Sequence, residues 1–215
     1  MSLITRALLL LSPRRRVRAA FRQHYERKDW LEPETVSGRG STLQRTAVIR
    51  RELPELFARL GVRSVLDAGC GDFNWFQTLA VDLETYLGIE VVEELVAENQ
   101  ARHGTSRRRF EALDIIRDPL PRVDLILCRD CLVHLKNRQV AAALRNFRRS
   151  GSRYLLATTF TGDHDNQDAP LGGWRPLNLN REPFALGSPL QVISESESVE
   201  DPRYLDKSLG LWSLE

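Results

Sequence analysis

Short apolar runs alternate with stretches of helical spacing between Val62 and Phe160. The runs that predict buried strands are SVLDAG (64–69), TYLGIE (85–90), RRFEALD (108–114), VDLILCRD (123–130) and RYLLATTF (153–160). The stretches that predict helices are WFQTLAVD (75–82), VEELVAENQARHG (92–104) and NRQVAAALRNFRRSG (137–151). Because strands separated by helices need parallel crossovers, this order predicts a doubly wound α/β sheet.

The two ends of the chain depart from this rhythm. LQVISES (190–196) and KSLGLWSL (207–214) predict two final strands that pair as a hairpin-like edge. Before Val62, Ser41-Thr42-Leu43-Gln44 has the spacing of a capping box, and Gly61 is expected to end the helix that it opens. We therefore divide the chain into a helical extension, residues 1–61, and a main domain, residues 62–215.

A polar segment without clear periodicity, residues 159–189, interrupts the main domain. Loops of this length inside a compact domain are usually lids, binding loops or disordered segments. Trp174 and Phe184 make disorder the less favoured option, so we predict a lid.

Charge is distributed unevenly along the chain. Residues 1–60 carry 13 Lys and Arg against 6 Asp and Glu, a net charge of +7, and the remainder carries 18 against 23, a net charge of −5. The basic start, residues 7–23, could bind an anionic surface such as lipid or nucleic acid, or it could be a helix packed on its own domain.

Three cysteines give no disulfide framework, which suits a reducing compartment. The apolar run Leu8–Leu11 is short for a signal peptide and precedes the arginines, and no stretch is long enough to span a bilayer. We expect a cytoplasmic protein.

The turn after the first strand, RSVLDAGCGDFNW (63–75), carries the clearest chemical signal. Gly69 and Gly71 leave room for a ligand to approach the backbone, although a tight turn without a ligand would look similar. Acids stand at the ends of the first three strands: Asp67, Glu90 and Asp114. Carboxyl ends of parallel strands share one crevice, where an acid can bind ribose hydroxyls. Asp72 disfavours phosphate, so a nucleoside without phosphates is the better ligand.

Four segments in order, VLDAGCGDFNW, YLGIE, ALDI and DLILCRDCLVHL, resemble the successive motifs of class I S-adenosylmethionine-dependent methyltransferases. The resemblance spans roughly residues 62–160 and implies a doubly wound, mostly parallel seven-stranded sheet of the Rossmann-like methyltransferase type, whose last strand is antiparallel. It also implies S-adenosyl-L-methionine as cofactor, with the methionine part at Asp67, Gly69 and Gly71, the ribose at Glu90 and the adenine at Asp114.

The sequence departs from the family pattern where Phe73 replaces the third glycine of the turn. This departure suggests that Phe73 or Trp75 lies against the cofactor, with core packing as the alternative for both. Arg129, in the motif after the fourth strand, is also assigned to the cofactor site.

Asp130 and His134 follow the fourth strand at the mouth of the same crevice and are the candidate catalytic residues. A hydroxyl acceptor needs a base, and histidine has a suitable pKa, although a histidine here could equally serve packing. Cys70, Cys128, Cys131 and His134 could instead hold zinc, but the usual second ligand pair is absent, so we predict no metal.

The lid contains six residues that suit a polar ring such as a sugar or nucleoside, and we predict that they bind the substrate: His164, Asn166, Asp168, Trp174, Arg175 and Asn178. A structured lid without direct contact is the alternative. The loop VSGRGST (36–42) is expected to close over the cofactor from the other side.

Taken together, these features predict a methyltransferase that methylates oxygen or nitrogen of a small polar acceptor, such as a saccharide or natural-product intermediate. One alternative is an RNA or protein acceptor recognised by the basic N-terminal part. The other is a non-catalytic nucleoside-binding scaffold, against which the intact glycines and acids speak. The sequence does not predict an oligomeric state.

Overall fold

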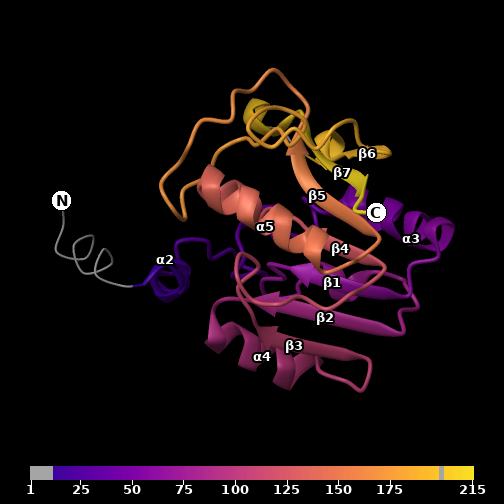
Figure 1. Cartoon of the computed structure of the whole chain (residues 1–215). Helices are drawn as coiled ribbons and strands as arrows, with labels where there is room; N and C mark the ends of the chain where they lie inside the picture. The colour runs from indigo at the N-terminus through magenta and orange to yellow at the C-terminus, as the bar shows by residue number, and fades with distance from the viewer. Residues whose placement is uncertain (1–11, 199–200) are drawn as a thin grey trace.

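The computed structural model describes residues 12–198 and 201–215 (Figure 1). Its α-helices are α2 (Pro13–Arg27), α3 (Ala47–Leu60), α4 (Glu93–His103) and α5 (Asn137–Arg149). Its strands are β1 (Ser64–Ala68), β2 (Thr85–Glu90), β3 (Arg108–Ala112), β4 (Leu125–Cys128), β5 (Tyr154–Phe160), β6 (Gln191–Ser194) and β7 (Lys207–Ser213). Single 3-10 turns complete it: η1 (Arg39–Ser41), η2 (Phe76–Thr78), η3 (Leu132–His134), η4 (Ser196–Ser198) and η5 (Pro202–Tyr204).

The strands form one seven-stranded sheet in the order β3-β2-β1-β4-β5-β7-β6. Pairs among β1 to β5 are parallel, whereas β7 pairs antiparallel with both β5 and β6. The predicted doubly wound sheet with an antiparallel edge is confirmed, and each predicted strand agrees with the structure to within two residues at either end. The sheet order reverses between β1 and β4, where ligands of such sheets bind.

Helices cover both faces of the sheet, as the alternation of buried side chains requires. Leu66 and Ile126 point to the face covered by α5, whereas the neighbouring residues Val65 and Leu127 point to the face covered by α3. Strands buried on both faces read as continuous apolar runs, which is why the sequence identified them. The end charges of α4 also suit the helix dipole, with acids in its first turn and basic residues in its last.

Two predicted helix features are wrong. The helix expected at residues 75–82 is reduced to the single turn η2, because Leu79 is extended and the aromatic side chains of Trp75 and Phe76 are buried. The helix expected from Ser41 begins only at Ala47. Ser41 belongs to η1 instead, and its carbonyl accepts a 3.1 Å hydrogen bond from the Asn74 side chain, which holds this loop against the glycine turn. Gly61 ends α3 as predicted, in a left-handed conformation.

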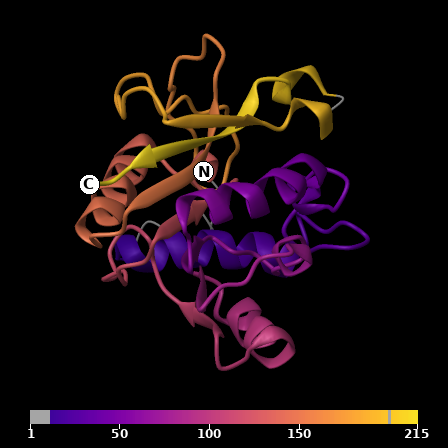
Figure 2. The same ribbon diagram turned by 90° about the vertical axis from the view of Figure 1, so that its right-hand side faces the viewer.

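The N-terminal helix α2 lies beside the carboxyl ends of β1, β2 and β3 (Figure 1), and a view turned by 90° shows it behind α3 (Figure 2). The long loop after β5 arches past the start of α5 (Figure 1). The Leu8–Leu11 run lies outside the described residues. Among the helices that the structure describes, none has the length and apolar character needed to cross a membrane.

Candidate functional site

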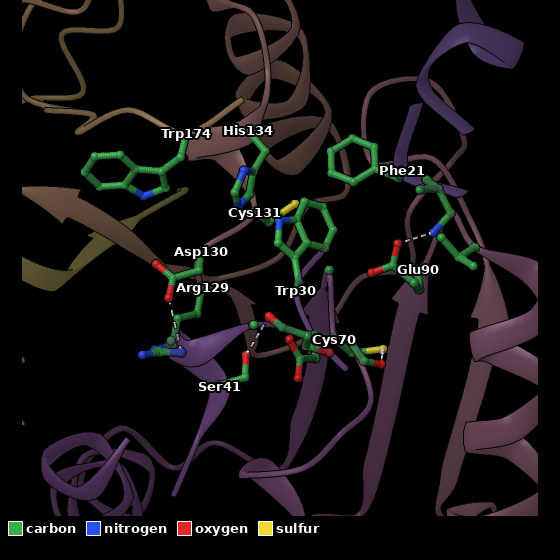
Figure 3. Close-up of a pocket in the computed structure, with 18 of the residues that line it drawn as sticks. Phe21, Trp30, Ser41, Cys70, Glu90, Arg129, Asp130, Cys131, His134 and Trp174 are labelled. Atoms are coloured by element: carbon green, nitrogen blue, oxygen red, sulfur yellow. Dashed lines mark hydrogen bonds and ion pairs between the residues drawn. The ribbon is translucent and has the colours of Figure 1, made fainter. Parts of the chain in front are cut away.

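A cavity of about 460 Å³ lies at the carboxyl ends of the central strands. One part is lined by the glycine turn and the strand-end acids, together with Val17, Phe21, Tyr25 and Trp30 from α2 and the segment after it. The other part is lined by residues from four further segments, with Asp130, His134 and Trp174 labelled in Figure 3. These residues are Val36 to Ser41, Arg45, Arg129 to Cys131, His134, Leu135, Trp174, Glu195, Asp201, Arg203, Tyr204 and Lys207. We call these the cofactor half and the acceptor half. The volume lies in the range of small-molecule sites.

The two glycines of the turn are packed so closely that no side chain fits. A Cβ at Gly69 would lie 2.8 Å from the Cys131 Sγ, and a Cβ at Gly71 would lie 2.3 Å from the Ser37 Oγ. Both glycines also have positive φ angles, 88° and 56°, which glycine adopts most readily. Their bare backbone therefore forms the floor between the two halves of the cavity.

Asp72, within the same turn, binds the loop of residues 36–41. Its carboxylate accepts hydrogen bonds from the Val36 amide (2.8 Å) and the Ser37 hydroxyl (3.0 Å), and its own amide donates to the Ser37 oxygen (2.8 Å). The loop thus lies against the glycine turn, and Val36 to Ser41 all line the cavity; its closure over the cofactor stays a prediction.

Phe73 does not line the cavity, so its predicted place against the cofactor is corrected here. Its side chain is 1% exposed and packs among Phe76, Tyr86 and Phe110, with ring centroids 5.0 to 5.7 Å apart. Its φ of 60° is the left-handed value that the family's third glycine would adopt freely. Trp75 does line the cavity, and the Arg129 guanidinium lies 5.6 Å from the centre of its ring.

The structure brings the three strand-end acids, Asp67, Glu90 and Asp114, to the cofactor half. Burial raises the pKa of Asp67 to about 7, although the Tyr86 hydroxyl donates a 2.7 Å hydrogen bond to its carboxylate. Burial also raises the pKa of Glu90, whose carboxylate accepts a hydrogen bond from the Val91 amide. Both carboxyl groups therefore stand in an environment that favours a cationic or hydrogen-bonding ligand.

Both carboxylate oxygens of Asp114 are bound by neighbouring residues. One carboxylate oxygen accepts the Ile116 amide at 2.8 Å, and the other pairs with Arg117 at 3.0 Å. These bonds fix the segment that forms the cavity wall at Ile115 and Ile116. Asn99 of α4, which the sequence analysis did not single out, donates a 2.7 Å hydrogen bond to the Gly71 carbonyl and fixes the turn from the other side.

Ion pairs to α4 hold α2 over the cofactor half. Arg18 pairs with Glu93 at 2.5 Å, Arg22 pairs with Glu94 at 2.5 Å, and the hydroxyl of Tyr25 donates to Glu98 at 2.9 Å. The sequence showed the basic character of this segment but not its partners, because the acids lie about 75 residues further along the chain.

Asp130 and His134 both line the acceptor half (Figure 3). The Lys207 ammonium lies 2.5 Å from the Asp130 carboxylate and, with Arg129, lowers its pKa to about 2. Burial lowers the pKa of His134, whose Nδ1 lies 3.2 Å from the Gly173 carbonyl. A carbonyl only accepts, so Nδ1 carries the proton and Nε2 has the free lone pair.

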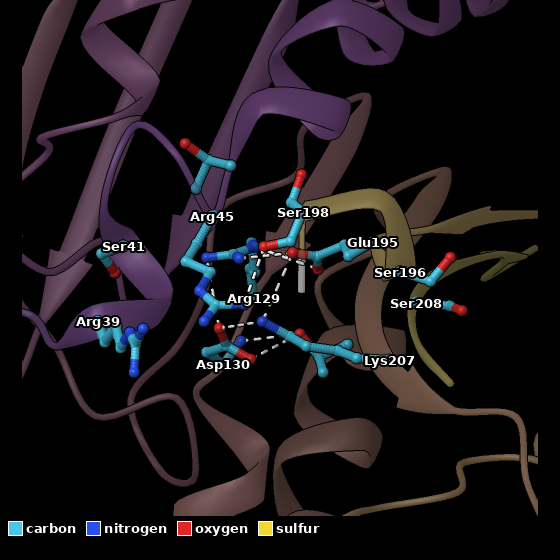
Figure 4. Close-up of polar contacts among 12 residues, drawn as sticks. Arg39, Ser41, Arg45, Arg129, Asp130, Glu195, Ser196, Ser198, Lys207 and Ser208 are labelled. Atoms are coloured by element: carbon cyan, nitrogen blue, oxygen red, sulfur yellow. Dashed lines mark hydrogen bonds and ion pairs between the residues drawn. The ribbon is translucent and has the colours of Figure 1, made fainter. Parts of the chain in front are cut away.

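Arg129, assigned to the cofactor from the sequence, is part of a buried ion network. Its guanidinium binds both carboxylate oxygens of Glu195, at 2.6 and 3.3 Å (Figure 4). Lys207 lies 3.5 Å from the same Glu195 carboxylate and bridges it to Asp130. Glu195 directly follows β6 and Lys207 begins β7, and no local motif marks either residue in the sequence.

Of the six lid residues, only Trp174 lines the cavity. The other five bind within the lid or to neighbouring segments. Asn166 bonds to Asn178 within the lid, and His164 pairs with Asp206 just before β7. Asp168 accepts the Asn137 amide at the start of α5, and Arg175 donates to the Val133 carbonyl of η3 and to the Asn137 side chain. The structure does not bring these five side chains to the acceptor half. Trp174 packs against Phe160 and Tyr204 at 5.8 and 4.9 Å.

Two of the three cysteines lie beside the glycine turn. Cys70 and Cys131 line the cavity and Cys128 is buried in β4, with all three thiols free. Among the residues that the structure describes, no group of three or more His, Cys, Asp or Glu side chains is arranged to hold a metal ion.

Comparisons with known proteins agree with this geometry. Residues 65–151 match the model of the methyltransferase domain family. The sheet order and the glycine turn are those of the class I S-adenosylmethionine-dependent methyltransferase fold, and the match places a methyltransferase domain over this part of the chain. No curated protein sequence matches the chain significantly.

Three solved structures illustrate the likeness in fold. Magnesium protoporphyrin IX methyltransferase (ChlM) from Synechocystis PCC 6803, with bound S-adenosylmethionine, is 16% identical, with a TM-score of 0.62 and coverage of 94% of this chain and 97% of that chain. The methyltransferase domain of bacterial CtHen1-C is 13% identical, with a TM-score of 0.59 and coverage of 79% and 98%. The N-methyltransferase NodS from Bradyrhizobium japonicum WM9, in complex with S-adenosyl-L-homocysteine, is 16% identical, with a TM-score of 0.55 and coverage of 76% and 86%.

The side chains and backbone of the cofactor half fit S-adenosylmethionine independently of the comparisons. The glycine floor leaves no room for a side chain but offers bare backbone, and the buried carboxyl groups of Asp67 and Glu90 suit the ammonium group and the ribose hydroxyls of this cofactor. Apolar side chains of Val92, Leu95 and Ile116 complete the wall on which an adenine would lie.

Proposed function

We propose that this methyltransferase methylates an oxygen or nitrogen atom of a small polar molecule, and that His134 accepts the proton which the acceptor loses. When bound, S-adenosylmethionine supplies a methyl group on a positively charged sulfur. The protein then has to align the acceptor, exclude water and take up one proton.

The environment of His134 is the observation that carries this proposal. Its pKa lies below the ordinary value because the ring is buried, so the imidazole is neutral near pH 7. The Gly173 carbonyl holds Nδ1–H, and the Trp30 ring lies 5.3 Å away, which keeps the orientation of the imidazole fixed. Asp130 remains ionised at this pH and can accept a hydrogen bond from the acceptor without taking its proton.

A small acceptor is better supported than RNA or protein. The cavity is walled by α2, by the loop of residues 36–41 and by Trp174 of the lid. Arg18 and Arg22, which could have offered a basic surface to a macromolecule, face the acids of α4 instead.

The test is a panel of hydroxyl and amine acceptors, including saccharides, assayed for transfer of a labelled methyl group by the wild type and by His134→Gln. We expect turnover on a small acceptor, and we expect the variant to lower kcat by about 10² to 10⁴ with unchanged affinity for S-adenosylhomocysteine. The wild-type rate should rise with pH up to the lowered pKa of His134 and stay flat above it, and this rise should be missing in the variant.

His103→Gln is the matched control, because His103 has a lowered pKa as well but packs against Phe73 outside the cavity. Turnover on macromolecules alone would refute the small acceptor. Full activity of His134→Gln would refute the role of His134.

A further inference from the structure

Among the residues that the structure describes, cationic side chains outnumber carboxylates in the acceptor half of the cavity. The cations are Arg39, Arg45, Arg129, Arg203 and Lys207, and the carboxylates are Asp130, Glu195 and Asp201. Since the cavity is partly closed off from water, such an excess of charge strongly selects the ligands that can enter it.

Three of these cations form ion pairs with the three carboxylates, and Arg129 and Lys207 each contact two of them. Arg129 binds Glu195 at 2.6 Å, Lys207 binds Asp130 at 2.5 Å, and Arg203 binds Asp201 at 2.7 Å. Figure 4 shows the first two pairs side by side. Each of these carboxylates therefore already has a cationic partner, and Arg45 also helps to lower the pKa of Asp201 through its charge, without an ion pair between them.

Two guanidinium groups, Arg39 and Arg45, remain on this wall without an ion-pair partner among residues 12–198 and 201–215. Arg45 is only 9% exposed, and among the described residues its guanidinium donates one hydrogen bond, to the Ser198 carbonyl at 2.9 Å. A guanidinium carries five N–H donors and stays charged, so burying it with one neutral acceptor is unfavourable unless an anion joins it.

Arg39 lies on the loop that closes over the floor of the cavity. It precedes Gly40, at which a Cβ would lie 2.8 Å from the Asp130 carboxylate, so this part of the backbone approaches the residue we place beside the acceptor. The loop is anchored through Ser37 to Asp72, which holds Arg39 near the acceptor half.

We infer that the methyl acceptor carries an anionic group, a carboxylate or a phosphate, and that Arg45 and Arg39 bind it. The inference rests on the proposed function, because it describes the acceptor of the same site. The cofactor does not remove the excess of positive charge: its one carboxylate is outweighed by an ammonium and a sulfonium, so it adds a further positive charge. The aromatic rings of Trp174 and Tyr204, whose centroids are 4.9 Å apart, line the same half and suit the ring of such a molecule.

The experiment titrates protein saturated with S-adenosylhomocysteine with three probes: benzoate, its neutral match benzamide, and inorganic phosphate. We expect benzoate or phosphate to bind and benzamide not to bind. Arg45→Gln and Arg39→Gln should each lower the affinity for the anion by about tenfold, because each variant loses one charge-assisted contact. Preference for benzoate or for phosphate tells which group the acceptor carries.

Arg122→Gln is the matched control, since it removes one positive charge from an exposed residue outside the cavity, before β4. Arg39→Gln keeps the test valid if the buried Arg45→Gln variant folds poorly, because Arg39 is exposed at the surface.

Three results would overturn the inference. The first is that neither anion binds the saturated protein, and the second is that both variants and the control bind them equally. The third is that both variants lower the affinity for S-adenosylhomocysteine but not the affinity for 5′-methylthioadenosine, which lacks the amino-acid part. In that case the two arginines bind the carboxylate of the cofactor. A failure of the proposed function looks different, because anion binding would persist while no acceptor is methylated.

Discussion

The carboxyl group of Asp67 is buried, so its negative charge is unfavourable in the unliganded protein. Burial raises its pKa to about 7 in the folded state, against about 3.9 for an ordinary aspartate. The folded state therefore binds this proton more tightly than the unfolded state. Below about pH 4 the carboxyl group is protonated in both states and does not change the free energy of unfolding. It destabilises the fold increasingly as the pH rises from about 4 to about 7.

Asp67→Asn should therefore stabilise the unliganded protein at pH 8 while it weakens binding of S-adenosylmethionine. Asparagine can still accept the hydrogen bond from Tyr86 but carries no charge to bury. We expect a gain of up to about 4 kcal/mol in the free energy of unfolding at pH 8, most of it lost by pH 5, together with at least about tenfold weaker cofactor binding. Thermal unfolding at both pH values and calorimetric titration measure these effects.

Asp82→Asn is the control, because Asp82 is almost fully exposed and its ion pair with Arg107, at 3.4 Å, lies at the surface. If Asp67→Asn is less stable than the wild type at pH 8, the buried charge of Asp67 does not destabilise the unliganded fold.

Residues whose role depends on strand position could be predicted from the sequence, whereas residues placed by long-range contacts could not. Asp67, Glu90 and Asp114 reach one crevice because parallel strands share an edge, and that follows from the local pattern. Phe73 could not be placed, since its left-handed backbone and its aromatic partners depend on β2 and β3. Lys207 lies next to Asp130 only because β7 returns beside β5.

At the level of elements, the loop of residues 36–41 connects the N-terminal extension to the glycine turn. The strands and the helices α4 and α5 were predictable from their periodicity, but this loop resembles a capping box in sequence and is held away from a helix by Asn74 and Asp72. The segment of residues 159–189 stood out in the sequence by its length and lack of periodicity, and its role as a lid stays a prediction. Its polar side chains bind its own backbone, because a long segment without regular structure must satisfy its own hydrogen-bonding groups.

Asp72→Ala should release this loop without unfolding the domain. The substitution removes the two acceptors for the Val36 amide and the Ser37 hydroxyl, each worth about 1 kcal/mol. We expect faster amide exchange at residues 36–41, affinity for S-adenosylmethionine lowered by about tenfold, and a nearly unchanged unfolding temperature. Asp82→Ala is the matched control, and unchanged exchange in the loop of Asp72→Ala would show that the contact does not hold it closed.

For the molecule as a whole, the uneven charge of the sequence becomes an intramolecular contact. The N-terminal part has a net charge of +7 and the rest −5, and the structure joins the basic helix α2 to the acidic face of α4 through Arg18, Arg22 and Tyr25. These pairs are partly exposed, so salt should screen them. Since α2 also forms a wall of the cavity, its docking and cofactor binding should share this dependence on salt.

We therefore expect the affinity for S-adenosylmethionine to fall about three- to tenfold between 50 and 500 mM salt, the combined effect of three weak surface contacts. The triple variant Glu93→Gln, Glu94→Gln, Glu98→Gln should show the weakened affinity already at low salt and little further change. Glu52→Gln, which removes an exposed partner of Arg51 outside the cavity, should behave as the wild type. If affinity is independent of salt in all three proteins, α2 is held by its apolar contacts alone. If RNA binds the wild type with a steep salt dependence, the arginines of α2 act outward as well, and the macromolecular acceptor regains support.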